Sequence, residues 1–245
     1  MESLSKNKIK WIRSLQQKKN REEFGLFVVE GEKMVNEALE SNTHEIVFLC
    51  ITKASAIDPK NPNYEVVLAS EDDLKSISTL KNPNKSLVVL RIPPQKEVNS
   101  DFKIALDGIQ DPGNMGTILR LADWFDVKEI ICSKDTVDIY NPKVVQASMG
   151  AIFRINVVYC DLPSYLSKTN EPIFGALLEG ENIYKKSVSP NGILVLGNEG
   201  NGISKEVISL VNEPITIPRF GKAESLNVSV ATGILLSEFF RGTVL

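Results

Sequence analysis

Residues 214–241, PITIPRFGKAESLNVSVATGILLSEFFR, predict a buried helix at the carboxyl end of the chain. The stretch begins with a short apolar run at 214–217 that is typical of a β-strand. In the expected helix, 227–241, apolar residues occur on nearly every side, as in helices that are covered all round. Because chain ends usually fray, a buried last helix predicts a fold that closes around it, with a site at its polar entrance, Ser225 and Asn227.

The composition is that of a globular protein with one large or two ordinary domains. The 245 residues are 42% hydrophobic and 24% charged, which are common proportions for such proteins. Nowhere does an apolar run approach the ~18–20 residues needed to cross a membrane. The amino terminus is polar and has no apolar signal core. We therefore expect a cytoplasmic protein with no membrane partner.

Cysteine and histidine, two residue types that commonly ligate metals, are few and scattered. Cys50, Cys132 and Cys160 are odd in number and widely spaced, which predicts buried, reduced thiols. His44 is the only histidine, so a multi-histidine metal site is excluded and imidazole acid–base chemistry is disfavoured. The sequence thus predicts no metal site.

The net charge of −3 hides a basic amino-terminal segment. Residues 1–24 hold seven basic and three acidic side chains, whereas residues 94–245 hold 14 basic and 18 acidic ones. A basic arm on an acidic body can bind phosphates, although the same pattern also fits one solvated helix face. The candidate phosphate-binding cations are Lys8, Lys10, Arg13, Lys18, Lys19 and Arg21.

The order of expected strands and helices divides the chain into two α/β units. Residues 1–93 have expected helices and strands at 6–19, 24–29, 32–40, 45–51, 64–68, 71–77 and 86–91. Residues 94–101 form the expected linker. Residues 102–245 alternate strand and helix, which predicts a mainly parallel sheet covered on both faces. The expected strands there are 103–107, 128–132, 155–159, 173–178, 193–197 and 214–217, and the helices are 115–125, 142–149, 163–168, 204–211 and 227–241.

One loop that could carry chemistry is DGIQDPGNMGTILRLADWF, residues 107–125, since sites in parallel sheets lie at the carboxyl ends of strands. Asn114 is expected to cap the following helix. Arg120 lies on the polar side of that helix, where it fits either a surface ion pair with Asp123 or a contact with a phosphate. The glycines lack the GxGxxG spacing, so a nicotinamide fingerprint is unsupported.

Two further loops have the same placement. In GILVLGNEGNGIS, residues 192–204, a buried strand runs into Gly197 and Glu199. Its glycines permit close approach of a ligand, although the stretch also fits a plain tight turn. The third loop is the entrance to the last helix, where Ser225 and Asn227 fit helix caps. A serine nucleophile is disfavoured because no histidine stands nearby as its base.

Together and in this order, the loops resemble the three motifs of the SpoU (TrmH-type) RNA 2′-O-ribose methyltransferases of the SPOUT superfamily. The matching stretches are NMGTILR at 114–120, LGNEGNGIS at 196–204 and IPRFGKAESLNVSVATGILLSEF at 217–239. The stretch NKIKWIRSLQQKKNREEFGLFVVEGEKMVNEAL at 7–39 resembles the substrate-binding domain of the longer members. The resemblance covers almost the whole chain.

The resemblance implies an α/β fold: a carboxyl-terminal trefoil-knot domain with a mainly parallel sheet, and a small amino-terminal α/β substrate-binding domain. It implies a homodimer with the site near the dimer interface, and it requires no metal. The cofactor would be S-adenosylmethionine, at positions that match Leu177, Gly197, Ile217 and Leu226. The implied catalytic and substrate positions are Asn114, Arg120, Glu199, Ser225 and Asn227.

The implied reaction methylates a ribose 2′-hydroxyl in RNA. A guanidinium stays protonated and is a poor base, so we expect Arg120 to clamp a phosphate and to orient and acidify the hydroxyl. The amino-terminal domain, which shorter tRNA-modifying relatives lack, favours ribosomal RNA, and its basic segment becomes an expected RNA contact. The alternatives are a tRNA methyltransferase, a catalytically silent RNA-binding or ribosome-assembly protein, and a nucleotide-dependent oxidoreductase.

Overall fold

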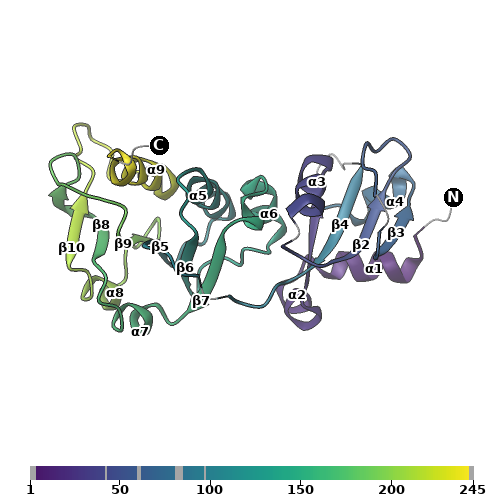
Figure 1. Cartoon of the computed structure of the whole chain (residues 1–245), viewed down its shortest axis with the longest axis horizontal. Helices are drawn as coiled ribbons and strands as arrows, with labels where there is room; N and C mark the ends of the chain where they lie inside the picture. The colour runs from purple at the N-terminus through teal and green to yellow at the C-terminus, as the bar shows by residue number, and fades with distance from the viewer. Residues whose placement is uncertain (1–3, 42, 60–61, 81–84, 97, 243–245) are drawn as a thin grey trace. The chain divides into compact units, whose positions relative to one another are not determined.

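A computed structural model describes residues 4–41, 43–59, 62–80, 85–96 and 98–242; Figure 1 shows their helices and strands. The chain forms two compact units. Met1–Pro94 and Asp138–Arg154 make up the first, and Gln95–Val137 and Ile155–Leu245 make up the second. The segment Asp138–Arg154 therefore packs with the amino-terminal residues, whereas the sequence predicts a single division at the linker.

The first unit is built on a four-stranded sheet in the order β1-β4-β2-β3. β4 pairs antiparallel with β1 and β2, while β3 pairs parallel with β2. The strands are β1 (Leu26–Glu30), β2 (Ile46–Ile51), β3 (Glu65–Leu68) and β4 (Ser86–Arg91). The helices are α1 (Lys6–Ser14), α2 (Lys18–Phe24), α3 (Glu32–Ser41), α4 (Glu71–Ile77), α6 (Pro142–Ser148) and the short 3₁₀ helix η1 (Ala151–Phe153).

The amino-terminal helix differs from its prediction. The expected helix at 6–19 ends at Ser14, and a separate helix, α2, follows it. α2 stops at Gly25, which has a φ of 64° and donates its N–H to the carbonyl of Arg21, an ending that glycine accommodates best. The core beneath α1 contains Ile12 and Phe48. Burial of each such side chain contributes about 1.5–3 kcal/mol, so the apolar side of α1 anchors it to the sheet.

The second unit has a six-stranded sheet in the order β10-β8-β9-β5-β6-β7, and each pair of neighbours is parallel. The strands are β5 (Phe102–Asp107), β6 (Glu129–Ser133), β7 (Asn156–Cys160), β8 (Ile173–Asn182), β9 (Gly192–Gly197) and β10 (Glu213–Thr216). The helices are α5 (Pro112–Trp124), α7 (Leu162–Leu166), α8 (Lys205–Ile208) and α9 (Val228–Phe240). α5 and α9 cover one face and α7 and α8 the other (Figure 1). The predicted parallel sheet with two covered faces is confirmed.

α5 begins earlier than predicted. Asp111, not Asn114, is its N-cap and accepts the N–H of Asn114 at 2.8 Å. Pro112 fills the first helical position, where its missing N–H costs nothing. The expected cap at Asn114 is therefore wrong, because the carboxylate of Asp111 already satisfies the first turn. This leaves the side chain of Asn114 free for other contacts.

α9 is only partly covered. It packs against α5 and β9, and its buried residues are Val228, Ser229, Thr232, Leu235, Leu236 and Phe239. Val230 on its outward side is 51% exposed, so the prediction of a helix buried all round is wrong for a single chain. The threading of the carboxyl end into a knot stays a prediction. Within the described ranges, no helix is both long and apolar enough to cross a membrane.

Candidate active site

Three of the predicted site residues form a chain of hydrogen bonds at the carboxyl edge of the second sheet. Asn114, in the first turn of α5, donates from Nδ2 to Oε1 of Glu199 at 2.7 Å. Asn227, the N-cap of α9, donates from Nδ2 to Oδ1 of Asn114 at 2.9 Å. Asn114 lies 85 residues from Glu199 and 113 from Asn227. The fold thus joins one residue from each of the three sequence motifs.

The donors and acceptors available fix the direction of these hydrogen bonds. Oδ1 of Asn227 accepts the N–H groups of Ser229 and Val230 at 3.0 and 3.4 Å, so its amide NH₂ must face Asn114. A carboxylate accepts hydrogen bonds and does not donate them, so Asn114 turns its NH₂ toward Glu199. Among the described residues, Oε2 of Glu199 has no hydrogen-bond partner. That oxygen can therefore accept a hydrogen bond from a substrate.

Ser229 belongs to the same cluster and was not predicted. Its hydroxyl donates to Oδ1 of Asn227 at 2.6 Å and lies 3.4 Å from Oδ1 of Asn114. The residue is only 9% exposed, so this hydroxyl helps to hold Asn227 in place. The sequence feature that could have indicated this role is a serine between two valines, Val228 and Val230, two positions after the N-cap Asn227.

Two predicted residues do not join the cluster. Arg120 is exposed on α5, and its guanidinium forms no hydrogen bond or ion pair with any residue that the structure describes. The surface ion pair with Asp123 is therefore not formed. Ser225 lies in the exposed stretch before α9, and its hydroxyl likewise has no partner in the described ranges. Both side chains face solvent, where a substrate could reach them.

The turn after β9 presents Glu199. A Cβ on Gly197 would overlap the backbone of Gly202 and Ile203, so only glycine fits there. Asn198 and Gly202 exchange two backbone hydrogen bonds of 2.9 Å, and Gly202 has a φ of 69°. The turn is thus closed at its base, with Glu199 between its two ends.

Two of the predicted cofactor residues lie at the same level of adjacent strands. The last paired residues of β8 and β9 are Gly175 and Val195, and Leu177 and Gly197 each stand two positions further on. The pairing of β8 with β10 is irregular, because Pro214 is opposite Gly175 but the next residue is opposite Glu181. Leu177 lies in this irregular section and is half-buried.

Ile217 and Leu226 lie in the exposed segment that leads from β10 to α9. Ile217 follows Thr216, whose hydroxyl donates to the carbonyl of Leu178 at 3.2 Å. Leu226 is 49% exposed and immediately precedes Asn227. Half-buried or exposed apolar side chains beside open backbone suit an adenosyl group, which needs both apolar contact and peptide hydrogen bonds. The residues present therefore fit S-adenosylmethionine.

The predicted phosphate-binding cations of the first unit differ in exposure. Lys10, Arg13, Lys18 and Lys19 are exposed. Lys18 is 3.7 Å from Glu22, a surface pair of little energetic value. Nζ of Lys8 lies 2.6 Å from Glu65 and 4.4 Å from the centroid of the Phe48 ring, so it is partly engaged within the unit.

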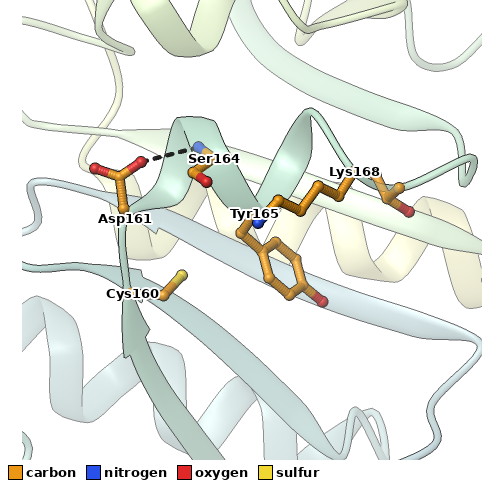
Figure 2. Close-up of a pocket in the computed structure, with 6 residues that line it drawn as sticks. Cys160, Asp161, Ser164, Tyr165 and Lys168 are labelled. Atoms are coloured by element: carbon orange, nitrogen blue, oxygen red, sulfur yellow. Dashed lines mark hydrogen bonds between the residues drawn. The ribbon is translucent and has the colours of Figure 1, made fainter.

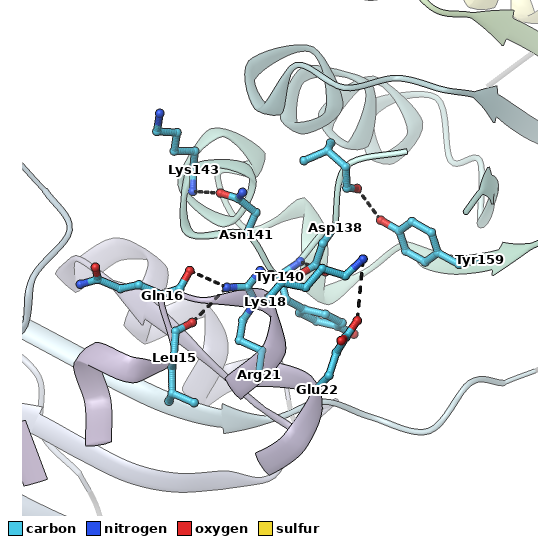
Figure 3. A network of polar contacts seen from close by, with 11 residues as sticks. Leu15, Gln16, Lys18, Arg21, Glu22, Asp138, Tyr140, Asn141, Lys143 and Tyr159 are labelled. Atoms are coloured by element: carbon cyan, nitrogen blue, oxygen red, sulfur yellow. Dashed lines mark hydrogen bonds and ion pairs between the residues drawn. The ribbon is translucent and has the colours of Figure 1, made fainter. Parts of the chain in front are cut away.

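Arg21 is buried, and Figure 3 shows the residues around it. It is 2% exposed and donates to the carbonyls of Leu15 and Gln16 at 3.0 and 2.9 Å. It also donates twice to Oδ2 of Asp138, at 2.6 and 3.1 Å. These bonds engage the guanidinium inside the first unit, whereas the sequence predicts that Arg21 contacts RNA.

A separate open pocket of about 510 Å³ lies at the carboxyl end of β7 (Figure 2). It is lined by Cys160, Asp161, Ser164, Tyr165, Lys168 and Thr169. Burial raises the pKa of Tyr165 to about 12 and also raises the pKa of Cys160. Both groups therefore stay protonated near neutral pH and offer neither a base nor a thiolate. Nothing in the described part of the chain groups three or more His, Cys, Asp or Glu residues as a metal site.

Two family models match this chain and together cover most of it. The SpoU rRNA Methylase family matches residues 101–237. The MRM3-like substrate binding domain matches residues 6–87. The first match includes all the residues of the hydrogen-bonded cluster, and the second includes the six cations considered above.

Individual relatives agree with these matches over nearly the full length. The chain is 31% identical over 242 residues to the 23S rRNA (guanosine(2553)-2′-O)-methyltransferase RlmP of Bacillus subtilis, covering 96% of this chain and 97% of RlmP. It is 30% identical to the 23S rRNA (guanosine-2′-O-)-methyltransferase RlmB of Neisseria meningitidis, covering 88% and 95%. The crystal structure of an AdoMet-bound rRNA methyltransferase from Sinorhizobium meliloti superposes with a TM-score of 0.88 at 27% identity, covering 100% and 98%. The chain therefore belongs to the SpoU rRNA methylase family.

Proposed function

We propose that this protein transfers a methyl group from S-adenosylmethionine to a ribose 2′-hydroxyl of ribosomal RNA. The observation that carries the proposal is the chain of hydrogen bonds from Asn227 through Asn114 to Glu199. Two full-length relatives are named 23S rRNA guanosine 2′-O-methyltransferases, which makes 23S rRNA the first substrate to test. The intact cluster argues against the catalytically silent alternative.

The side chains of the cluster would orient the ribose. Oε2 of Glu199 can accept a hydrogen bond from a ribose hydroxyl, and Asn114 and Asn227 hold that carboxylate in position. The exposed guanidinium of Arg120 can bind an RNA phosphate through two parallel hydrogen bonds. Such positioning can supply about 7–11 kcal/mol of a reaction barrier, so no strong base is required.

We assign the cofactor to the edge formed by β8, β9 and β10. Leu177, Gly197, Ile217 and Leu226 would hold S-adenosylmethionine there. When bound, that cofactor supplies a methyl group made electrophilic by its sulfonium. We assign the proton of the attacking 2′-hydroxyl to a neighbouring phosphate oxygen or to water, and the positive charge of Arg120 would favour its loss by stabilising the negative charge that develops on the hydroxyl oxygen.

We further propose that RNA contacts the exposed cations of α1 and α2, which are Lys10, Arg13, Lys18 and Lys19. Each phosphate neutralised by such a cation adds about 0.7–0.9 to the slope of log affinity against log salt. We propose that the protein acts in the cytoplasm, where a ribosomal RNA substrate would be available.

We also propose a homodimer. Leu226 and Val230 at the amino end of α9 are 49% and 51% exposed, and Trp124 at the carboxyl end of α5 is 83% exposed. Exposed apolar side chains on two packed helices are candidates for a protein interface. Because Leu226 and Val230 stand on either side of Asn227, the N-cap of α9, a second copy docked on this helix pair would lie beside the site.

Incubation with labelled methyl donor and unmodified RNA tests the activity. We expect 2′-O-methylated nucleosides after digestion of the 23S transcript, and none from the tRNA pool. Labelled tRNA with unlabelled 23S transcript would instead favour the tRNA alternative. Absence of any 2′-O-methylated nucleoside, together with no calorimetric binding of S-adenosylmethionine, would support the silent RNA-binding alternative.

A further inference from the structure

Asn198, the first residue after β9, fastens the turn that carries Glu199 to a neighbouring strand. Its Nδ2 donates to the carbonyl of Gly108 at 2.7 Å, and Gly108 is the first residue after β5. Its Oδ1 accepts the backbone N–H groups of Gly200 and Asn201 at 2.9 and 3.1 Å. One side chain therefore closes the turn and also anchors it to the adjacent strand.

The anchor continues across a third strand. The N–H of Gly108 donates to Oγ of Ser133 at 2.9 Å, and that hydroxyl donates to Oδ1 of Asp135 at 2.6 Å. Ser133 ends β6 and is only 7% exposed. Gly108 has a φ of 73°, and a Cβ there would lie 3.1 Å from Oδ2 of Asp135. Since β9, β5 and β6 are neighbours in the sheet, this line of hydrogen bonds runs along its carboxyl edge.

The turn has little else to hold it. Residues 199–202 are all exposed, so they bury little apolar surface, and such segments open at low free-energy cost. Besides the hydrogen bond that the Glu199 carboxylate accepts from Asn114, what holds Glu199 in place is the backbone bridge between Asn198 and Gly202 together with the three hydrogen bonds of the Asn198 side chain. A misplacement of about 1 Å in a catalytic group can cost 10²-fold in rate.

We propose that Asn198 is a positioning residue for methyl transfer. Its carbonyl oxygen already accepts two hydrogen bonds and its amide nitrogen is directed at Gly108, so it acts through Glu199 rather than on the substrate. Through Glu199 it sets the position of Asn114, and through Asn114 that of Asn227. This inference rests on the proposed function, in which Glu199 holds the ribose.

Asn198→Asp separates the two roles of the side chain. It keeps an acceptor for Gly200 and Asn201 but replaces the donor to Gly108 with an oxygen that repels the carbonyl. We expect kcat to fall about 10- to 100-fold, while the Kd for S-adenosylmethionine measured by calorimetry stays within about twofold of wild type. Asn201→Ala is the matched control, because that side chain has no hydrogen bond within the described ranges, and it should retain wild-type kcat.

A double-mutant cycle with Glu199→Ala distinguishes positioning from a general loss of structure. If Asn198 acts through Glu199, Asn198→Asp should cause almost no further loss in single-turnover rate once Glu199 is Ala. Ser133→Ala removes the hydroxyl that accepts the N–H of Gly108, at the other end of the same line of hydrogen bonds, and should also lower kcat. This variant keeps the test informative if a variant at position 198 does not fold. Wild-type kcat in Asn198→Asp, or losses that add in the cycle, would overturn the inference alone. An inactive wild-type protein would overturn the proposed function and this inference together.

Discussion

Arg120 stands on the exposed side of α5 without a hydrogen bond or ion pair to the described residues. Arg120→Ala should therefore leave the melting temperature and cofactor affinity unchanged. If the guanidinium clamps an RNA phosphate, the same variant should lose on the order of 10²-fold or more in kcat/KM.

Single-turnover methylation, thermal unfolding and calorimetry on Arg120→Ala provide these three readouts. Lys205→Ala is the matched control, since it removes another exposed cation of the same unit, on α8. Near-normal turnover in Arg120→Ala would contradict the phosphate clamp.

Glu129, at the start of β6, is a buried carboxyl group with a testable effect of pH on stability. It is 6% exposed, and burial raises its pKa despite a hydrogen bond from Asn156 at 2.9 Å and the nearby charge of Lys103. A pKa that is higher in the folded than in the unfolded state stabilises the fold below the unfolded pKa. That contribution is lost as the pH rises through the folded pKa. At pH 7 the folded protein therefore bears the cost of a buried carboxylate.

Glu129→Gln removes this cost and keeps the shape of the side chain. We expect a higher melting temperature than wild type at pH 7, and a difference that shrinks as the pH falls through the raised pKa of the folded state and is absent below about 4.3, the ordinary pKa of Glu. Calorimetric unfolding at several pH values measures it, with the exposed Glu206→Gln as control. A lower melting temperature for Glu129→Gln at pH 7 would show that the attraction to the nearby charge of Lys103 outweighs the burial.

At the scale of elements, hydrophobic periodicity predicted the strands of the second sheet because those strands are continuous apolar runs between turns. Hydrophobic periodicity could not predict at which residue α5 begins, because Asp and Asn are both good N-caps and stand at 111 and 114. It missed α2, whose sequence KKNREEF has no apolar stripe. That helix is held instead by Arg21, which reaches Asp138 across 117 positions of the sequence. Such contacts are set by tertiary structure rather than by local pattern.

The paired helices α5 and α9 carry the prediction of a homodimer. Val230 is half exposed on α9, so Val230→Asp places a charge on the proposed interface without disturbing the core. We expect this variant to be monomeric and poorly active at concentrations where the wild type is dimeric, as measured by sedimentation equilibrium. Ile208→Asp, which charges another exposed apolar residue, on α8, should remain dimeric. A wild type that is monomeric throughout would contradict the dimer.

At the scale of the whole molecule, the segment Asp138–Arg154 packs with the first unit although the SpoU family match includes it. The ring of Tyr140 lies 4.6 Å from that of Phe27, and Arg154 pairs with Glu37 at 3.0 Å. A Cβ on Gly150 would overlap the carboxylate of Glu37. The sequence motifs predicted the two kinds of domain. They did not predict that Asp138–Arg154 packs with the first unit, because that packing depends on contacts between residues more than 100 positions apart.

The ion pair of Arg21 with Asp138 supplies the test of that packing. The side chains are 3% and 16% exposed, and removing one member of such a pair leaves the other charge without compensation. Arg21→Ala should therefore lower the free energy of unfolding by about 3 kcal/mol, measured by urea denaturation. Lys19→Ala, on the same helix but exposed, should leave stability unchanged and instead weaken RNA binding and its salt dependence.

The two variants thus separate structure from recognition. Because the Arg21 guanidinium is directed at Asp138 and at two backbone carbonyls, its loss should affect RNA affinity only through unfolding. At temperatures well below the melting transition, Arg21→Ala should bind RNA with the wild-type salt slope. A stable Arg21→Ala protein with a reduced salt slope would mean that Arg21 leaves Asp138 to contact phosphate, and that the first unit rearranges when RNA binds.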